Sequence, residues 1–252
     1  MAKHPFQNFA VDHTTILFQP QLYTVMYATF RIIFGATIDD ILYEKRRKGN
    51  DGQEVSMTYA TRMGKWDSQG TNQLHTVFAL VQPSEPAHEP SHVREMLDGH
   101  NAAAHVQHVA LRTPDLISFH QFALERGVQF VTPILKDESD NLIQVFSGEL
   151  YFPGIQASGM FFEFLQRNPT NAELDQIHKA NNETWFRDKT FLGLYGEKEQ
   201  EYQSGKVKPF FSEEQFTEIS SYIGKKQVWQ ITEDDLSQIE KIMLKHGSKN
   251  NR

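Results

Sequence analysis

A pattern that occurs twice, 95 residues apart, limits the fold of this 252-residue chain more than any other feature of its sequence. Val11–His13 and Val106–His108 are both Val-x-His triplets inside runs of β-forming residues. A proline follows each run, and residues with the spacing of an amphipathic helix follow the proline. A period of this length is too long for a solenoid repeat. The pattern therefore predicts a duplicated module.

Strand-like segments follow the predicted helix in both halves. The first half continues with TIDDILYEKR, EVSMTYATRM and LHTVFALVQ, and the second with NLIQVFSGEL and GMFFEFLQR. This order gives two βαβββ modules, which we place at about residues 9–82 and 104–167. The predicted fold class is α+β, with paired βαβββ modules that form an open barrel around one cavity, followed by C-terminal helices.

Local signals predict where helices begin and end. In the second module, Thr113 is the expected N-cap of the helix. Residues 199–252 are predicted to form a helical C-terminal extension. Within it, Ser212 with Gln215 has the capping-box pattern, and Gly247 is expected to stop the last helix.

Composition excludes several classes of function. The net charge of −7 and the lack of a basic block argue against a partner that is a nucleic acid. The chain has no cysteine, which rules out disulfides, thiolate metal ligands and a cysteine nucleophile. We find no apolar run of membrane-spanning length and no signal-peptide core at the N-terminus, so we expect a cytoplasmic protein without a membrane partner.

The repeated histidines are candidates for a metal site. The first strands of two equivalent modules are expected to lie side by side, and side-chain alternation can then direct His13 and His108 into one cavity. Glu163 is a lone carboxylate among apolar residues in MFFEFLQR and needs an ion or a partner when buried. Two histidines and one carboxylate are the ligand set of non-haem Fe(II) oxygenases. The alternatives are core imidazoles bonded to carbonyl groups and, for Glu163, a salt bridge to Arg167.

A second histidine motif competes with this interpretation. HEPSH, from His88 to His92, formally matches the H-E-x-x-H motif of zinc proteases. That chemistry requires both histidines on one turn of a helix, and Pro90 lies between them. The sequence therefore argues against a protease.

Four blocks of the sequence resemble the catalytic domain of the 4-hydroxyphenylpyruvate dioxygenase family, which belongs to the vicinal oxygen chelate superfamily of paired βαβββ modules. The blocks are VDHTTI, VQHVALRT, NLIQVFS and FFEFLQR. The resemblance implies a catalytic domain over residues 1–198 with iron ligands at His13, His108 and Glu163. The family's N-terminal pair of modules has no counterpart in this sequence.

The resemblance also implies polar contacts to a substrate. Ser56, Gln107 and Gln144 match polar residues of the family's pocket, and the two glutamines are expected to orient the substrate as catalytic residues. At two further candidate substrate contacts the chain departs from the family, which usually has asparagine in place of Gln82 and glutamine in place of His92. The alternative for these polar side chains is that they only satisfy hydrogen bonds of the barrel.

Two phenylalanines match aromatic residues of the family's pocket. Phe146 is similar to an aromatic wall. FRDKTFLGLYGEKE, about residues 186–198, is similar to the family's closing helix, and Phe191 within it matches a ring-stacking phenylalanine. Plain core packing is the alternative for both side chains.

The expected activity is therefore that of an Fe(II)-dependent dioxygenase with O₂ as co-substrate. It would oxidatively decarboxylate a 2-oxo acid of the aryl- or alkyl-pyruvate type and hydroxylate the same substrate, in a pocket altered from that of the family. Two alternatives stay open, a non-catalytic protein that binds small molecules and an isomerase or lyase that uses another divalent metal. A homo-oligomer is compatible with the sequence.

Overall fold

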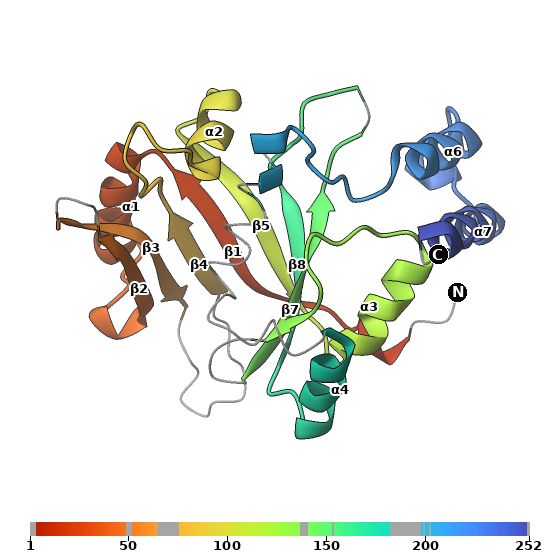
Figure 1. The fold of residues 1–252 in the computed structure, drawn as a ribbon, viewed down its shortest axis with the longest axis horizontal. Helices are drawn as coiled ribbons and strands as arrows, with labels where there is room; N and C mark the ends of the chain where they lie inside the picture. Colours follow the sequence, from red (N-terminus) through yellow and green to blue (C-terminus); the bar gives the residue numbers. More distant parts are fainter. Residues whose placement is uncertain are drawn as a thin grey trace. The chain divides into compact units, whose positions relative to one another are not determined.

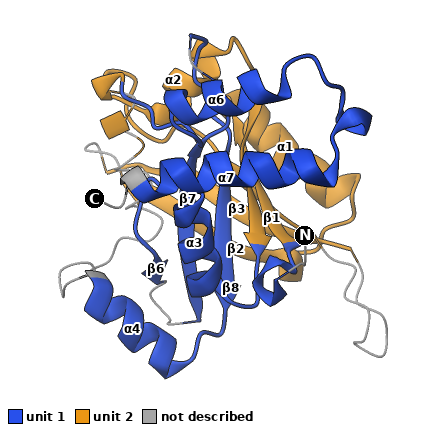
Figure 2. Cartoon of the chain, turned by 90° about the vertical axis from the view of Figure 1, so that its right-hand side faces the viewer, with its two compact units in different colours: residues 1–10, 112–197, 206–252 blue, residues 11–111, 198–205 orange. Residues whose placement is uncertain are grey.

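The computed structural model describes residues 4–48, 52–64, 76–136, 141–152, 154–181, 198, 200–201 and 203–250. The chain divides into two compact units, coloured separately in Figure 2. Unit 1 comprises residues 1–10, 112–197 and 206–252, and unit 2 comprises residues 11–111 and 198–205. Among the described residues, no helix is both long enough and apolar enough to cross a bilayer.

Unit 2 contains the first predicted module. Its elements are β1 (Ala10–Phe18), α1 (Pro20–Ile32), η2 (Ile38–Asp40), β2 (Ile41–Lys48), β3 (Glu54–Met63), β4 (Thr76–Val81), α2 (His92–Gly99) and β5 (Ala104–Arg112). β1 is parallel to β4, and β2–β3 and β3–β4 are antiparallel pairs. The βαβββ order predicted for the first half is confirmed.

The core of unit 2 lies between α1 and one face of the strands (Figure 1). Phe18, Tyr23, Phe30, Tyr59 and Leu80 form a buried cluster there. The rings of Tyr23 and Tyr59 meet edge to face at 5.3 Å between centroids, a favourable arrangement for aromatic pairs. The same cluster fixes which face of β1 is directed away from α1.

β1 and β5 are neighbours in the sheet of unit 2, in the strand order β2-β3-β4-β1-β5. The backbone amide of Gln19, just after β1, donates to the carbonyl oxygen of Ala103, just before β5, at 2.9 Å. The end of one strand therefore lies beside the start of the other, as in antiparallel pairs. The prediction that the first strands of the two modules lie side by side is confirmed.

Unit 1 contains most of the second module and the C-terminal helices. Its elements are η1 (Pro5–Gln7), α3 (Leu116–Glu125), β6 (Leu135–Lys136), β7 (Leu142–Glu149), β8 (Phe161–Arg167), α4 (Asn171–Asn181), α6 (Glu213–Ile223), η4 (Val228–Gln230) and α7 (Glu233–Asn250). β7 pairs antiparallel with β6 and with β8. With β5, the second half again has the order βαβββ, so the α+β fold class of paired modules is confirmed.

The predicted start of α3 is wrong by two residues. Asp115, rather than Thr113, is the N-cap, and its carboxylate accepts a hydrogen bond from the backbone amide of Ser118 at 2.9 Å. The Thr113 hydroxyl donates instead to the carbonyl oxygen of Phe6 at 2.6 Å. Because the Thr113 hydroxyl binds a residue that is far away in the sequence, it does not cap the helix.

The C-terminal helices also depart from two local predictions. Ser212 caps α6 as predicted, but the side chain of Gln215 donates to the carbonyl oxygen of Arg126 and does not complete a capping box. α7 does not stop at Gly247 and continues to Asn250. A Cβ at position 247 would clash with backbone atoms of Glu125, so this glycine allows α7 to approach α3 closely.

Candidate metal centre

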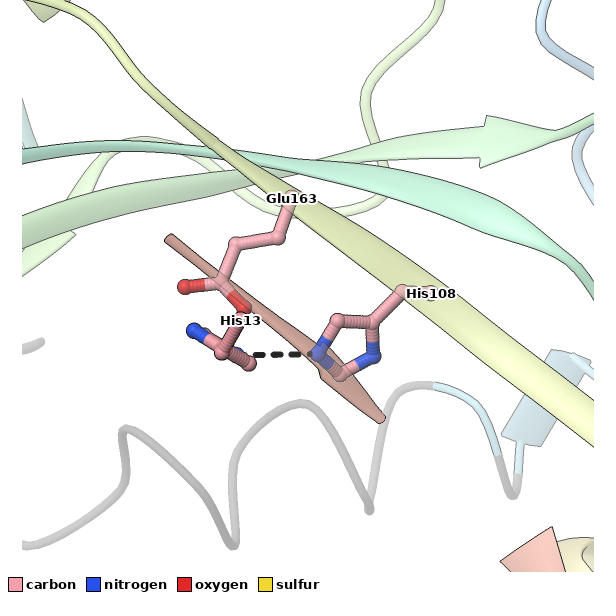
Figure 3. A group of neighbouring side chains, drawn as sticks. All are labelled: His13, His108 and Glu163. Carbon is pink, nitrogen blue, oxygen red and sulfur yellow. Dashed lines mark hydrogen bonds between the residues drawn. The ribbon is translucent and has the colours of Figure 1, made fainter. Parts of the chain in front are cut away.

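His13 on β1 and His108 on β5 direct their imidazoles toward each other. Their Nε2 atoms lie 3.3 Å apart, and the two rings are nearly perpendicular, with centroids 5.4 Å apart (Figure 3). His108 is 6% exposed, and the side chain of His13 is 20% exposed. The neighbouring strands of unit 2 therefore bring together two histidines that are far apart in the sequence.

The residue that precedes each histidine binds its other ring nitrogen. Asp12 Oδ1 lies 3.2 Å from His13 Nδ1, and Gln107 Oε1 lies 3.2 Å from His108 Nδ1. Asp12 and Gln107 occupy equivalent positions of the duplicated pattern. Carboxylate and amide oxygens accept hydrogen bonds, so each Nδ1 is assigned as the protonated nitrogen and each Nε2 carries a lone pair.

These tautomers place two lone pairs face to face. The hydroxyl of Thr15 lies 2.9 Å from His108 Nε2 and donates to that lone pair, which agrees with the assignment. Two imidazole lone pairs at this distance repel each other unless a proton or a metal ion lies between them. Imidazoles whose Nδ1–H groups are held by oxygen acceptors are the usual form of histidine metal ligands. The donor set of the pair therefore suits a divalent cation.

Glu163 is the carboxylate of the predicted triad and lies on β8 in unit 1. It is 3% exposed, and it pairs with Phe146 across β7 and β8. Directly paired residues of antiparallel strands direct their side chains to the same face, and Gln144 is two residues from Phe146. Glu163, Gln144 and Phe146 therefore share one face of this hairpin.

His13, His108 and Glu163 each offer one ligand atom, and these atoms lie within 4.8 Å of one another (Figure 3). A divalent ion with bonds of about 2.1 Å holds ligand atoms that are up to about 4.2 Å apart. The Nε2 atoms of His13 and His108, which both belong to unit 2 and lie 3.3 Å apart, are within this limit. Two imidazoles and a carboxylate suit iron, manganese, cobalt or zinc, so the three residues form a candidate site for a divalent metal ion of unspecified identity.

His92 and Gln82 are two further predicted site residues of unit 2, and they have different hydrogen-bond partners. Gln107 and His92, the first residue of α2, are both buried, and Gln107 Nε2 lies 3.4 Å from His92 Nε2. Gln107 therefore contacts both His92 and His108. Gln82 follows β4, is 8% exposed, and donates through its amide nitrogen to the carbonyl oxygen of Ser56.

Ser56 does not lie beside the histidines. Its hydroxyl is 2.9 Å from the hydroxyl of Tyr23, on the face of the sheet that α1 covers. Alternation along β1 places His13 on the opposite face, because Ile16 and Phe18 pack under α1. A register shift between Lys45 and Arg46 of β2 leaves Met57, just after Ser56, as an extra residue of β3 and breaks the alternation there, which a strand pattern cannot reveal.

Two further predictions concern residues outside this group. Phe191 and residues 186–197 of the predicted closing helix lie outside the described residues. The HEPSH motif does not form a helical turn, because Ser91 is the N-cap of α2 and the His88 side chain is 81% exposed before it. The prediction that HEPSH does not form one helical turn is confirmed.

Sequence reasoning missed Asp12 and Thr15 as part of this site. Asp12 had a signal, because it occupies the position equivalent to Gln107 in the repeated pattern. Thr15 had none, since a threonine in a strand is common and its contact with His108 depends on the register of β1 against β5.

No protein-family model matches the chain, and no curated protein matches it. Among solved structures, the chain is similar to a mutant of 4-hydroxymandelate synthase from Streptomyces coelicolor, with 17% identity, a TM-score of 0.43 and 66% of this chain covered. The chain spans half of that protein's length. Methylmalonyl-CoA epimerase from Mycobacterium tuberculosis matches with 17% identity and a TM-score of 0.41, covering 69% of this chain and 96% of the epimerase. At such identities and scores, the likeness assigns no reaction to this chain.

Proposed function

We propose that this protein is an Fe(II)-dependent dioxygenase that oxidatively decarboxylates a 2-oxo acid and hydroxylates the same molecule. The observation that carries the proposal is the arrangement of His13 and His108, whose Nε2 lone pairs face each other at 3.3 Å while each Nδ1 is held by an oxygen acceptor. A buried carboxylate, Glu163, completes the ligand set of two histidines and one acid that non-haem Fe(II) oxygenases use.

When bound, iron would supply a Lewis acid for the carboxylate and keto oxygens of the substrate and a binding position for O₂. The chain itself supplies orientation. Asp12 and Gln107 fix the rotation and tautomer of the two imidazoles, so that both Nε2 atoms are directed toward each other. The Thr15 hydroxyl donates to the same Nε2 of His108 and would give up this hydrogen bond to a bound ion.

Gln144 and Phe146 are the groups that we assign to the substrate. Both are buried and share the strand face of Glu163, so a molecule held near this carboxylate would meet an amide and an aromatic ring. The amide can donate to and accept from a polar group of the substrate. The ring of Phe146, packed against Phe161, would exclude water from the reacting part of the substrate.

Gln107 has a more restricted role than the resemblance implies. Its Oε1 accepts from His108, so only its NH₂ group is available to a substrate or to His92. We therefore assign Gln107 to positioning His108 and, through its amide nitrogen, to donating one hydrogen bond. His92 contacts Gln107 and is therefore close enough to affect which substrate is accepted.

The test is turnover by protein purified without oxygen and loaded with Fe(II). A panel of aryl- and alkyl-pyruvates is added with O₂, and oxygen uptake and CO₂ release are measured together. We expect coupled uptake and release with at least one 2-oxo acid, loss of both in His108→Ala, and retention in His88→Ala, which changes an exposed histidine.

The outcomes separate this proposal from its two alternatives. Iron bound without oxygen uptake on any 2-oxo acid would contradict the dioxygenase and favour an isomerase or lyase of the same metal site. Failure of the wild-type chain to retain any divalent metal would favour a binding protein without catalysis.

A further inference from the structure

A cavity of about 450 Å³ lies within unit 2, on the face of the strands that α1 covers. It is formed by α1, η2, β2 and β3, all of which belong to unit 2. Its walls consist of three tyrosines, two isoleucines and four polar residues, namely Tyr23, Tyr27, Tyr59, Ile38, Ile41, Thr24, Glu44, Arg46 and Ser56. Nothing in the proposed function uses this space.

The cavity is separate from the candidate metal centre. Tyr23 and Tyr59 belong to the core cluster that Ile16 and Phe18 contact from β1. His13 lies on the opposite face of β1 from those two residues, because side chains alternate along a strand. The sheet of unit 2 therefore stands between the cavity and the histidines.

The hydrogen bonds of the wall residues show which hydroxyl donors a ligand could use. The hydroxyl of Tyr23 is bonded to that of Ser56 at 2.9 Å, and Ser56 also bonds to Glu44. The Tyr27 oxygen accepts from Arg31 Nη1 at 3.1 Å, which leaves its own proton available. The Tyr59 hydroxyl is buried and has no hydrogen-bond partner among the described residues. The walls thus have unused donors.

These phenols remain donors at any ordinary pH. Burial raises the pKa of Tyr23 to about 12, and burial raises the pKa of Tyr59 as well. A ligand oxygen that accepts a hydrogen bond is therefore the complement of the Tyr59 hydroxyl.

The charges on the walls neutralise each other. Arg46 donates to both carboxylate oxygens of Glu44, at 2.7 Å from Nη2 to Oε2 and 3.1 Å from Nε to Oε1, and its Nη1 reaches Glu54 at 3.4 Å. A ligand carboxylate would face Glu44, and a ligand ammonium would compete with Arg46 for Glu44. An uncharged ligand is not repelled by Glu44 and does not compete with Arg46.

The rest of the wall is apolar and aromatic. Tyr27 and Ile38 are 37% and 64% exposed, so the apolar lining extends to the molecular surface. Tyr27 meets Tyr59 edge to face at 5.3 Å between ring centroids. Such walls suit a ring or a short alkyl body.

We propose that this cavity is a second ligand site, which binds an uncharged molecule with an aromatic or aliphatic body and a hydroxyl or carbonyl oxygen. The body packs on the three tyrosines, and the oxygen accepts a hydrogen bond from Tyr59. This site goes beyond the proposed dioxygenase activity and does not depend on it.

The experiment is an amide NMR titration of the 252-residue chain with three matched probes, benzyl alcohol, benzoate and benzylamine. We expect saturable shifts at Thr24, Ser56 and Tyr59 with benzyl alcohol, and affinities at least fivefold weaker for the two charged probes. Tyr59→Phe removes only the hydroxyl and should weaken benzyl alcohol about three- to tenfold. Tyr43→Phe changes a tyrosine of β2 that does not line the cavity and should leave the affinity unchanged.

A second variant tests the location without altering the core. Thr24 is exposed on α1 and lines the cavity, so Thr24→Trp should fill its opening and abolish the saturable shifts. The proposal is overturned if benzyl alcohol causes no saturable shift at these residues, if a charged probe binds as tightly, or if Tyr59→Phe and Thr24→Trp both bind like the wild-type chain.

Discussion

The Nε2 atoms of His13 and His108 lie 3.3 Å apart, although 95 residues separate the two histidines in the chain. Each ring is held by a side-chain oxygen from the preceding residue, so the pair is oriented before any ion binds. Orienting ligands in advance lowers the entropy that metal binding must overcome. An ion that binds this oriented pair should therefore raise the free energy of unfolding, which stability measurements can detect.

The first prediction is that divalent metals stabilise the protein through this pair. At a free-ion concentration about 100-fold above Kd, binding should add about 2.7 kcal/mol to the free energy of unfolding. For a chain of this length, that raises Tm by roughly 5–10 °C. The measurement is a thermal melt with and without Mn²⁺, Co²⁺ or Zn²⁺. His108→Ala should lose the increase and His88→Ala should keep it, and equal increases in both variants would refute the assignment.

The second prediction concerns Asp12, which contacts His13 rather than an ion. Asp12→Ala should weaken divalent-metal affinity about 10- to 100-fold, because the His13 ring loses the acceptor that fixes its tautomer. Asp12→Asn keeps an acceptor oxygen, so its affinity for divalent metal should lie between that of the wild-type chain and that of Asp12→Ala. Calorimetric titration with Co²⁺ measures both variants, with Asp39→Ala as the control at an exposed aspartate. Unchanged affinity in Asp12→Ala would mean that the ring is oriented by other contacts.

The repetition in the sequence was sufficient to predict the module order and the proximity of His13 and His108. Val-x-His appears in both first strands, and neighbouring first strands bring the two histidines together without any knowledge of the intervening loops. Glu163 was identifiable because a carboxylate inside an apolar strand needs a partner. These predictions depend on patterns that the local sequence contains.

The errors share a different cause. Ser56 is on the α1 face because of a register shift between β2 and β3, and the strand pattern of EVSMTYATRM does not record the neighbouring strand. Thr113 does not cap α3 because its hydroxyl binds Phe6, which lies far away in the sequence. Gly247 resembles a helix stop but is a point of close contact with α3. In each case a tertiary contact overrides a local signal.

The third prediction concerns the pH dependence of stability through His120. Burial lowers the pKa of its imidazole to about 4, and the ring packs on Phe130 with centroids 4.5 Å apart. The unfolded chain, with a pKa of about 6.5, takes up a proton below that pH, whereas the folded chain does so only near pH 4. The free energy of unfolding should therefore fall as pH drops from about 6.5 to 4, by on the order of 3 kcal/mol in total.

His120→Leu isolates this contribution, because leucine is apolar and cannot take up a proton. Denaturant unfolding at pH 7 and pH 4.5 should show the variant gaining about 2–3 kcal/mol relative to the wild-type chain at the lower pH. Other groups titrate in both proteins and cancel in the difference. A difference that does not change with pH would show that His120 is protonated in the folded chain.

The last prediction is that Gly247→Ala destabilises the protein. Helix propensity alone predicts the opposite, because alanine in a helix interior is favoured over glycine by about 1 kcal/mol. Position 247 lies within α7, however, and a Cβ there would clash with the backbone of Leu124 and Glu125 at the end of α3. Backbone atoms cannot move aside as a flexible side chain can, so α7 would have to shift away from α3, at a cost of about 1–3 kcal/mol.

Thermal or denaturant unfolding measures the sign of the change in the free energy of unfolding. The control is Ser248→Ala, at an exposed position one residue further along the same helix, which should stay within about 0.5 kcal/mol of the wild-type chain. A stabilised Gly247→Ala variant would show that α7 does not pack closely on α3 in solution.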